Sequence, residues 1–147
     1  MFGKTIFELA IGDYAEQNNV LSLEDAYKYA GITGDNNPIH FDTQAAYESK
    51  FARPIAHGMI LAGFISGVIG SKLPGFGCIY EKQSLKFTKP VFYDDEICTR
   101  VTVMEINQEK NRITLKTECS NQNNEIVLTG EAVVLPRRGE YKCNSLT

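Results

Sequence analysis

An uncharged, largely apolar run from Pro54 to Ser71 constrains the fold of this 147-residue chain more than any other feature. The run reads PIAHGMILAGFISGVIGS, and its helical part, about residues 58–71, is apolar on nearly all sides, as in a helix enclosed by protein. A helix of this length is too short to cross a bilayer, which needs roughly 20 apolar residues. The sequence therefore predicts an enclosed helix in a globular domain, with no membrane span.

The chain that follows this helix has the character of β-strands. Four segments are rich in alternating or β-branched apolar residues: 84–89, 96–106, 111–120 and 125–136. The links between the last three, NQEKN and NQNN, are short and polar, which predicts an antiparallel meander. One apolar helix against one long antiparallel sheet is an α+β plan, with the helices segregated to one face.

The first third of the chain is expected to form short helices. Ser22 and Asp25 match a capping box at the start of one helix, and Gly34 marks its exit. A second short helix is expected to begin near Asp42 and to extend to Phe51. The length favours one domain, residues 1–136, followed by a polar tail, residues 137–147, that we expect to be poorly ordered.

Composition narrows the possible functions. The formal net charge of −3 argues against a broad nucleic-acid surface. The N-terminal stretch MFGKTIFELAIGDY lacks a basic segment followed by a long apolar one, so no signal peptide is expected. The cysteines, which form no C-x-x-C pair, indicate reduced structural thiols in a cytoplasm. A zinc site is not expected, because neither of the two histidines is beside a cysteine.

The stretch TGDNNPIHFD, residues 33–42, is a candidate for acid–base chemistry. Asp35 and His40 lie on either side of an Asn37–Pro38 turn, and such a turn can direct both side chains toward one point. A carboxylate and an imidazole that converge on one water form a plausible acid–base pair. The residues alone leave a second interpretation open, in which Asp35 caps a helix or turn and His40 packs in the interior.

A second candidate is the start of the uncharged helix, at His57 and Gly58. The first N–H groups of a helix have no partner within it and favour negative charge. Gly58 has no side chain to block a ligand, so its N–H could stabilise a carbonyl oxygen that gains negative charge. The alternative is that Gly58 only lets the chain enter the helix, while His57 caps or packs.

Two glycines in the same helix, Gly63 and Gly67, fall four residues apart and therefore on one face. An interior glycine destabilises a helix by about 1 kcal/mol relative to alanine. Tight packing of another backbone or room for a ligand could offset this, and the helical pattern does not decide between them.

Taken together, these motifs resemble the MaoC-like, (R)-specific enoyl-CoA hydratases. YAGITGDNNPIHFD, residues 29–42, is similar to their hydratase 2 motif, an aromatic residue and a spacer followed by S/T-G-D-x-N-P-aliphatic-H. RPIAHGM, residues 53–59, resembles the family's R-P-I-x-H-G-M segment, and SLKFTKPVFYDDEI, residues 84–97, its next strands. The resemblance runs from about residue 22 to residue 135 and is strongest toward the small standalone hydratases of polyhydroxyalkanoate synthesis.

The resemblance implies a hot dog fold, in which a curved antiparallel sheet wraps a long helix, and a cytoplasmic homodimer that binds acyl-CoA. It implies that Asp35 activates a water and that His40 holds the water and assists proton delivery. The Gly58 N–H would polarise the thioester carbonyl, and Asn37, with His57, would support the motif. No metal, redox or other cofactor is implied, and neither nucleic acid nor a membrane is an expected partner.

One position departs from the family pattern. In the family that this chain resembles, a serine follows the H-G-M-x-x-A run, whereas this chain has Gly63. The acyl pocket is expected near Met59, Gly63, Ser66 and Gly67, and the small residues there predict a pocket that is not restricted to the shortest chains.

Three alternative functions use the same fold. A 3-hydroxyacyl-ACP dehydratase would run the reaction in reverse on a carrier protein. A thioesterase would aim water at the carbonyl carbon. A non-catalytic acyl-CoA-binding module would dispense with the acid–base pair, so the presence of both Asp35 and His40 argues against it.

Overall fold

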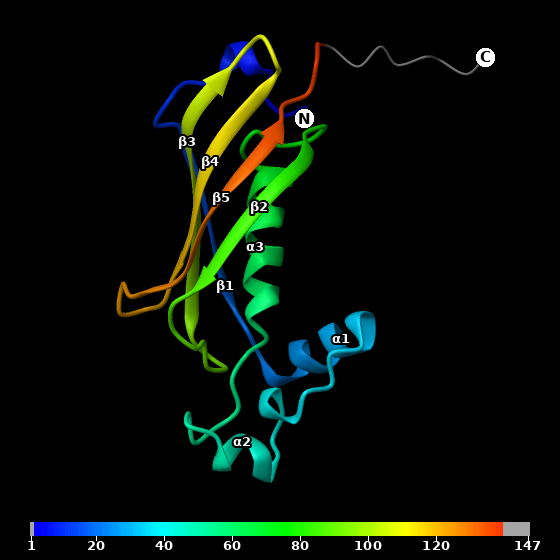
Figure 1. Cartoon of the computed structure of the whole chain (residues 1–147), viewed down its shortest axis with the longest axis vertical. Coiled ribbons are helices and arrows are strands. Elements are labelled where there is room, and N and C mark those ends of the chain that lie inside the picture. Colours follow the sequence, from blue (N-terminus) through cyan, green and yellow to red (C-terminus); the bar gives the residue numbers. More distant parts are fainter. Residues whose placement is uncertain (1, 140–147) are drawn as a thin grey trace, which may run out of the picture.

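The computed structural model describes residues 2–139, and within them a single antiparallel sheet lies against one long helix (Figure 1). The elements in chain order are η1 (Ile6–Glu8), β1 (Tyr14–Val20), α1 (Leu23–Thr33), η2 (Pro38–His40), α2 (Gln44–Glu48), α3 (Gly58–Ser71), β2 (Ile79–Phe87), β3 (Glu96–Asn107), β4 (Arg112–Ser120) and β5 (Ile126–Leu135). This arrangement confirms the predicted α+β architecture.

The strands lie in the order β1-β3-β4-β5-β2, and every neighbouring pair is antiparallel. The consecutive strands β3, β4 and β5 are neighbours, which confirms the predicted meander. In the register of this meander, Val103 pairs with Leu115 and Leu115 with Ala132, so apolar side chains align on the face toward α3. Strands β1 and β2 form the two edges of the sheet.

Helix α3 begins and ends at the predicted residues, but only one side of it is covered. Leu61, Ile65 and Val68 are buried in the core against the sheet. On the other side Met59 is 52% exposed, and a Cβ at Gly63 would meet no atom within 4 Å. The prediction of a helix enclosed on all sides is therefore wrong for the single chain, because the sheet covers one face only.

The prediction that the first third is helical is wrong for Tyr14–Val20, which form the edge strand β1. The strand pairs with β3, so that Tyr14 lies opposite Thr102 and Val20 opposite Glu96. None of its residues is fully buried, so backbone pairing rather than an apolar face places it in the sheet.

Two further boundaries differ from the predictions. Helix α2 ends at Glu48 instead of reaching Phe51, because the C-cap Ser49 has extended backbone; its N–H donates to the Ala46 carbonyl. Strand β2 begins at Ile79, ahead of the predicted start at Ser84, because its first half, IYEKQ, pairs with β5. This half lacks the alternating apolar pattern and is mostly exposed, so the sequence did not mark it.

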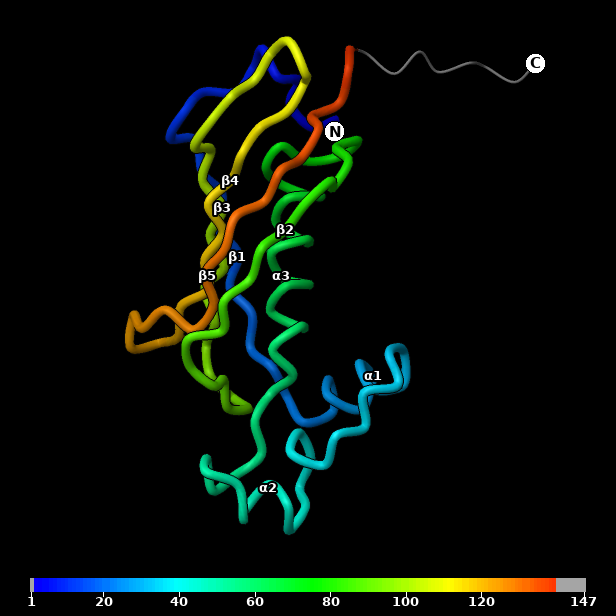
Figure 2. Tube along the Cα trace, in the orientation of Figure 1, coloured from blue at the N-terminus to red at the C-terminus, as the bar shows by residue number. Residues whose placement is uncertain are grey.

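The capping box at the start of α1 and the glycine at its end are both as predicted, and the glycine sets where the chain leaves the helix. The Ser22 hydroxyl accepts from the Asp25 N–H, and the Asp25 carboxylate accepts from the Ser22 N–H. Gly34 ends the helix with φ 79°, and its N–H donates to the Ala30 carbonyl at 2.8 Å. The next residue, Asp35, then enters the segment that lies at the N-terminal end of α3 (Figure 2).

Three cysteines, Cys78, Cys98 and Cys119, are free thiols, whereas Cys143 lies outside the described residues. Burial raises the pKa of Cys119 to about 11. Among residues 2–139, no helix is long and apolar enough to cross a membrane. The expected tail begins with Arg137, whose guanidinium donates to the Gly3 carbonyl, and residues 140–147 lie outside the described part of the chain.

Candidate active site

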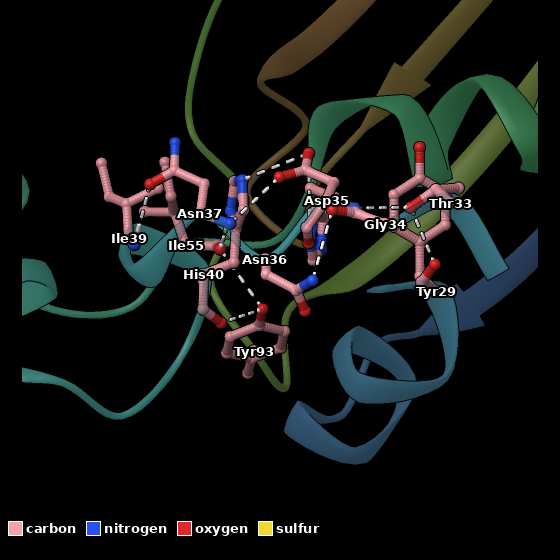
Figure 3. Close-up of polar contacts among 11 residues, drawn as sticks. Tyr29, Thr33, Gly34, Asp35, Asn36, Asn37, Ile39, His40, Ile55 and Tyr93 are labelled. Atoms are coloured by element: carbon pink, nitrogen blue, oxygen red, sulfur yellow. Dashed lines mark hydrogen bonds and ion pairs between the residues drawn. The ribbon is translucent and has the colours of Figure 1, made fainter. Parts of the chain in front are cut away.

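The stretch after α1 is a compact turn built by its own side chains (Figure 3). The Thr33 hydroxyl accepts from the Asp35 N–H at 3.2 Å, and the Asp35 carboxylate accepts from the Asn37 N–H at 3.2 Å. The Asn37 side-chain oxygen accepts from the Ile39 N–H at 3.2 Å and caps the short helix η2. These bonds hold Asp35 and His40 on one side of the turn.

The Asp35 and His40 side chains face each other across a gap. The His40 Nε2 atom lies 4.0 Å from the Asp35 Oδ2 atom, and His40 is 12% exposed against 47% for Asp35. The distance is too long for a direct hydrogen bond, whereas one water about 2.8 Å from each atom fits between them. The predicted pair is thus brought together with one side open to solvent.

The tautomer of His40 follows from its other ring nitrogen. The His40 Nδ1 atom lies 2.9 Å from the Ile55 carbonyl, which can only accept, so Nδ1 carries the proton in the neutral ring. The lone pair of Nε2 then faces Asp35. Burial lowers the pKa of His40 below its usual 6.5, although the bond to Ile55 and the charge of Asp35 act in the opposite direction.

A residue that the sequence did not single out supports this arrangement. The Tyr93 hydroxyl donates to the His40 carbonyl at 2.6 Å and also lies 3.2 Å from the Ile55 carbonyl (Figure 3). Burial raises the pKa of Tyr93 to about 12, so the phenol stays a donor. Tyr93 lies 53 residues beyond His40, so no local spacing in the sequence connects the two. The only hint was that Tyr93 falls in the segment SLKFTKPVFYDDEI, which resembles the family.

An apolar pocket of about 510 Å³ opens beside His40, at the N-terminal end of α3. Its lining includes His40, Gly58, Met59 and Phe87. Gly58 is the first residue of the helix, so its N–H is among those without a partner inside the helix. A Cβ at this position would lie 2.7 Å from the Phe87 ring, so any larger residue would need that ring or the helix end to shift.

His57, expected to support the motif, lies directly behind the pair. It is 1% exposed, and its Nε2 atom lies 3.1 Å from the Asp35 carbonyl oxygen. Its ring stacks on that of His40 with centroids 3.8 Å apart and planes 30° apart. The structure therefore gathers Asp35, His40, His57 and Gly58 in one place.

The remaining predicted positions lie along the open face of α3. Met59 lines the pocket beside His40, whereas Gly63, Ser66 and Gly67 lie further along the helix and outside that lining. A Cβ at Gly63 or Gly67 would meet no atom within 4 Å, so this face has free space in the single chain.

Asp35, His40 and His57 each place one potential metal-ligand atom within 4.8 Å of the others. The two imidazole rings stack, and the Nε2 atoms of His40 and His57 lie 4.0 and 3.9 Å from the Asp35 Oδ2 atom. The Nε2 atom of His57 is also engaged by the Asp35 carbonyl. The donor set fits a water between Asp35 and His40 better than a metal ion.

Comparison with known proteins places the chain in a family. The model of the MaoC like domain matches residues 10–125, so the chain belongs to the MaoC-like family. The (R)-specific enoyl-CoA hydratase of Rhodospirillum rubrum is 43% identical over 129 residues, which cover 87% of this chain and 89% of the relative. The enzyme of that name from Aeromonas caviae is 40% identical over 126 residues, 86% of this chain and 94% of the relative.

Comparison with solved structures supports the same family assignment. The unliganded R-hydratase PhaJ1 of Pseudomonas aeruginosa superposes with a TM-score of 0.88 at 35% identity, covering 93% of this chain and 88% of that chain. The A. caviae (R)-hydratase involved in PHA biosynthesis gives 0.84 at 39% identity, covering 87% and 97%. The fold is therefore the hot dog fold that the sequence resemblance implied.

Proposed function

We propose that this protein adds water reversibly to trans-2-enoyl-CoA thioesters to give (R)-3-hydroxyacyl-CoA. The observation that carries the proposal is the 4.0 Å gap between Asp35 Oδ2 and His40 Nε2, beside a pocket that also includes Gly58. The (R)-specific enoyl-CoA hydratases at 40–43% identity are lyases, and their similarity over most of the chain supports the same activity here.

The chemistry follows from the positions of these groups. Asp35 accepts a proton from the bridging water as the water oxygen bonds to the β-carbon. Electron density moves to the thioester carbonyl oxygen, where the Gly58 N–H stabilises it. The α-carbon then takes up the proton that Asp35 accepted, with His40 assisting its delivery, so one water is added overall and Asp35 is again ionised. Because the addition of water involves no net oxidation or reduction, the reaction needs no redox cofactor, and the Gly58 N–H supplies the polarisation of the carbonyl.

The acyl chain is proposed to extend along the open face of α3, past Met59, Gly63, Ser66 and Gly67. The two glycines leave this face without side-chain volume, and a Cβ at either would meet no neighbouring atom within 4 Å. This space suits chains longer than the four carbons of crotonyl-CoA.

The protein is proposed to act as a cytoplasmic homodimer that binds acyl-CoA. Two features support a second copy: the open face of α3 and the edge strand β2, where Ile79 is 64% exposed. The A. caviae hydratase is involved in PHA biosynthesis, and we propose the same supply role for this protein. Sedimentation equilibrium of the purified chain tests the dimer, and a monomer at micromolar concentration would contradict it.

The proposed reaction is tested by incubating the protein with crotonyl-CoA and following the loss of the enoyl absorbance. Chiral analysis should show the (R)-3-hydroxy product, and loss of absorbance should proceed without release of free CoA thiol. Free thiol released with the enoyl absorbance intact would instead indicate a thioesterase.

The second candidate is the dehydratase direction on a carrier protein. The mitochondrial 3-hydroxyacyl-[acyl-carrier-protein] dehydratase of Arabidopsis thaliana is 35% identical over 130 residues, 86% of this chain and 77% of the relative. Comparing kcat/KM for crotonyl-CoA with that for the crotonyl carrier-protein thioester distinguishes the two, and a clear preference for the carrier would favour this candidate.

A further inference from the structure

We infer that His57 is a positioning residue that fixes the separation between the acid–base pair and the carbonyl-polarising Gly58 N–H. The inference rests on the proposed function and adds to it a role for the second histidine of the chain, which takes no part in the proton transfers. The side chain and the backbone of His57 both contribute to this positioning.

The side chain of His57 holds the turn that carries Asp35. Its Nε2 atom lies 3.1 Å from the Asp35 carbonyl oxygen, although 22 residues separate the two in sequence. The side chain is 1% exposed, so this hydrogen bond is shielded from competing water. Movement of the His57 ring would therefore move the Asp35 backbone.

The backbone of His57 positions the other half of the site, the N–H of Gly58. His57 is the N-cap of α3, and the Gly58 N–H belongs to the peptide bond that joins the two residues. A single residue thus connects the turn with the acid to the N–H that faces the carbonyl. In the proposed reaction these two points must span the water, the β-carbon and the thioester carbonyl, so an error in their separation lowers the rate.

The contacts also assign the tautomer of His57. A carbonyl oxygen only accepts, so the bond to Asp35 places the proton on Nε2. The Nδ1 atom is buried and has no hydrogen-bond partner among the described residues. A lone pair tolerates that position better than a second N–H would. His40 has the opposite tautomer, because its carbonyl partner, Ile55, is at Nδ1.

The surroundings of the ring are aromatic, apart from one carboxylate. The rings of Tyr29, His40 and Phe41 have their centroids 4.7, 3.8 and 5.9 Å from that of His57. The Asp35 Oδ2 atom lies 3.9 Å from the His57 Nε2 atom. Two variants distinguish the contribution of the hydrogen bond from that of the aromatic packing. His57→Phe keeps an aromatic ring but has no donor. His57→Gln has no ring but places an N–H close to the Nε2 position.

The first test compares both variants with wild type in crotonyl-CoA hydration. His57→Phe leaves the Asp35 carbonyl without its donor from the interior, and we expect kcat to fall roughly 10- to 100-fold. KM should change less than about threefold, because His57 does not contact substrate. His57→Gln should restore kcat to within about fivefold of wild type, since it restores the donor. A His57→Phe variant with wild-type kcat, or a His57→Gln variant no better than it, would overturn the inference.

The second test reads the tautomers directly and does not depend on activity. The chain has two histidines, so an untagged, ¹⁵N-histidine-labelled sample gives two imidazoles in a long-range ¹H–¹⁵N spectrum. We expect one ring protonated on Nε2, assigned to His57 by its persistence in His40→Gln, and one protonated on Nδ1. A His57 ring with its proton on Nδ1 and none on Nε2 would overturn the inference even if both His57 variants failed to fold.

The two tests also separate failure of this inference from failure of the proposed function. A wild-type protein that does not hydrate crotonyl-CoA refutes the function, while the tautomers still test the His57–Asp35 bond. An active wild type with the wrong tautomer at His57 refutes the positioning role alone.

Discussion

The Tyr93 hydroxyl donates a hydrogen bond to the His40 carbonyl at 2.6 Å, across 53 residues of sequence. Tyr93 lies between β2 and β3, so this bond connects the end of the sheet to the turn that carries the acid–base pair. The same hydroxyl lies 3.2 Å from the carbonyl of Ile55, the residue that fixes the His40 ring. The sheet thereby helps to hold the imidazole in place.

Replacing Tyr93 by phenylalanine should weaken both the fold and the activity. The variant leaves the His40 carbonyl without its donor, and we expect the free energy of unfolding to fall by about 1 kcal/mol and kcat by several-fold. Urea denaturation and crotonyl-CoA hydration measure the two effects. Tyr47→Phe is the matched control, because that hydroxyl donates to Asp42 at the surface. Equal changes of unfolding free energy and kcat in Tyr93→Phe and Tyr47→Phe would contradict the role of Tyr93.

Adding a methyl group at Gly58 should impair catalysis. A Cβ there would lie 2.7 Å from the Phe87 ring, so either the ring or the helix end must shift. We expect Gly58→Ala to lower kcat/KM on the order of tenfold or more, because the N–H that stabilises the oxyanion is displaced. Gly31→Ala in α1 is the control: its Cβ meets no atom within 4 Å, so it should leave kcat/KM unchanged. A fully active Gly58→Ala enzyme would argue against the assigned oxyanion site.

Filling the open face of α3 should change the preference for acyl chain length. Gly63→Leu adds a branched side chain where a Cβ meets no neighbouring atom. We expect kcat/KM for longer enoyl-CoAs to fall about tenfold relative to that for crotonyl-CoA. The crotonyl-CoA rate of the variant serves as its internal control for folding. If the ratio between short and long substrates stays the same, the pocket assignment is wrong.

The lowered pKa of His40 predicts how activity and stability respond to acid. Burial disfavours the charged ring, so the neutral form persists below pH 6.5, the usual pKa. Since the neutral Nε2 atom must accept from the water, the acid limb of kcat/KM should lie below pH 6.5. A limb above that value would contradict this assignment.

The lowered pKa of His40 also predicts that the folded protein is less stable in acid. The unfolded chain binds the His40 proton at a higher pH than the folded chain does, so acid favours unfolding. The contribution of His40 is present above pH 6.5 and is lost as pH falls from there through the lower pKa of the folded state. His40→Gln should flatten the dependence of unfolding free energy on pH in this window; an unchanged slope would contradict it.

The sequence predicted the parts of the fold that have a strong apolar pattern. Helix α3 and the meander β3–β5 carry the core, and their spacing of buried residues is what the pattern detects. Strand β1 was missed because YAEQNNV contains no fully buried residue and is held by backbone pairing with β3. The open side of α3 was missed because an apolar sequence indicates that a helix can be buried but does not identify the element that buries it.

The candidate site was predictable where its residues are close in sequence. The turn from Thr33 to His40 makes its own hydrogen bonds, so its shape follows from local chemistry. The bonds from Tyr93 to His40 and from His57 to Asp35 join distant segments, and no local pattern encodes them. His57 was identified as support for the motif only through the resemblance of RPIAHGM to the family's segment.

The most direct test of the account is the rate of crotonyl-CoA hydration by Asp35→Asn and by His40→Gln, measured beside wild type. Asp35→Asn keeps the shape of the side chain and removes its basicity, and His40→Gln removes the ring nitrogen that faces the water. With both variants folded, as judged by thermal unfolding, we expect each to lose at least ~100-fold in kcat. Wild-type activity in either variant would contradict the assignment of Asp35 and His40 as the acid–base pair.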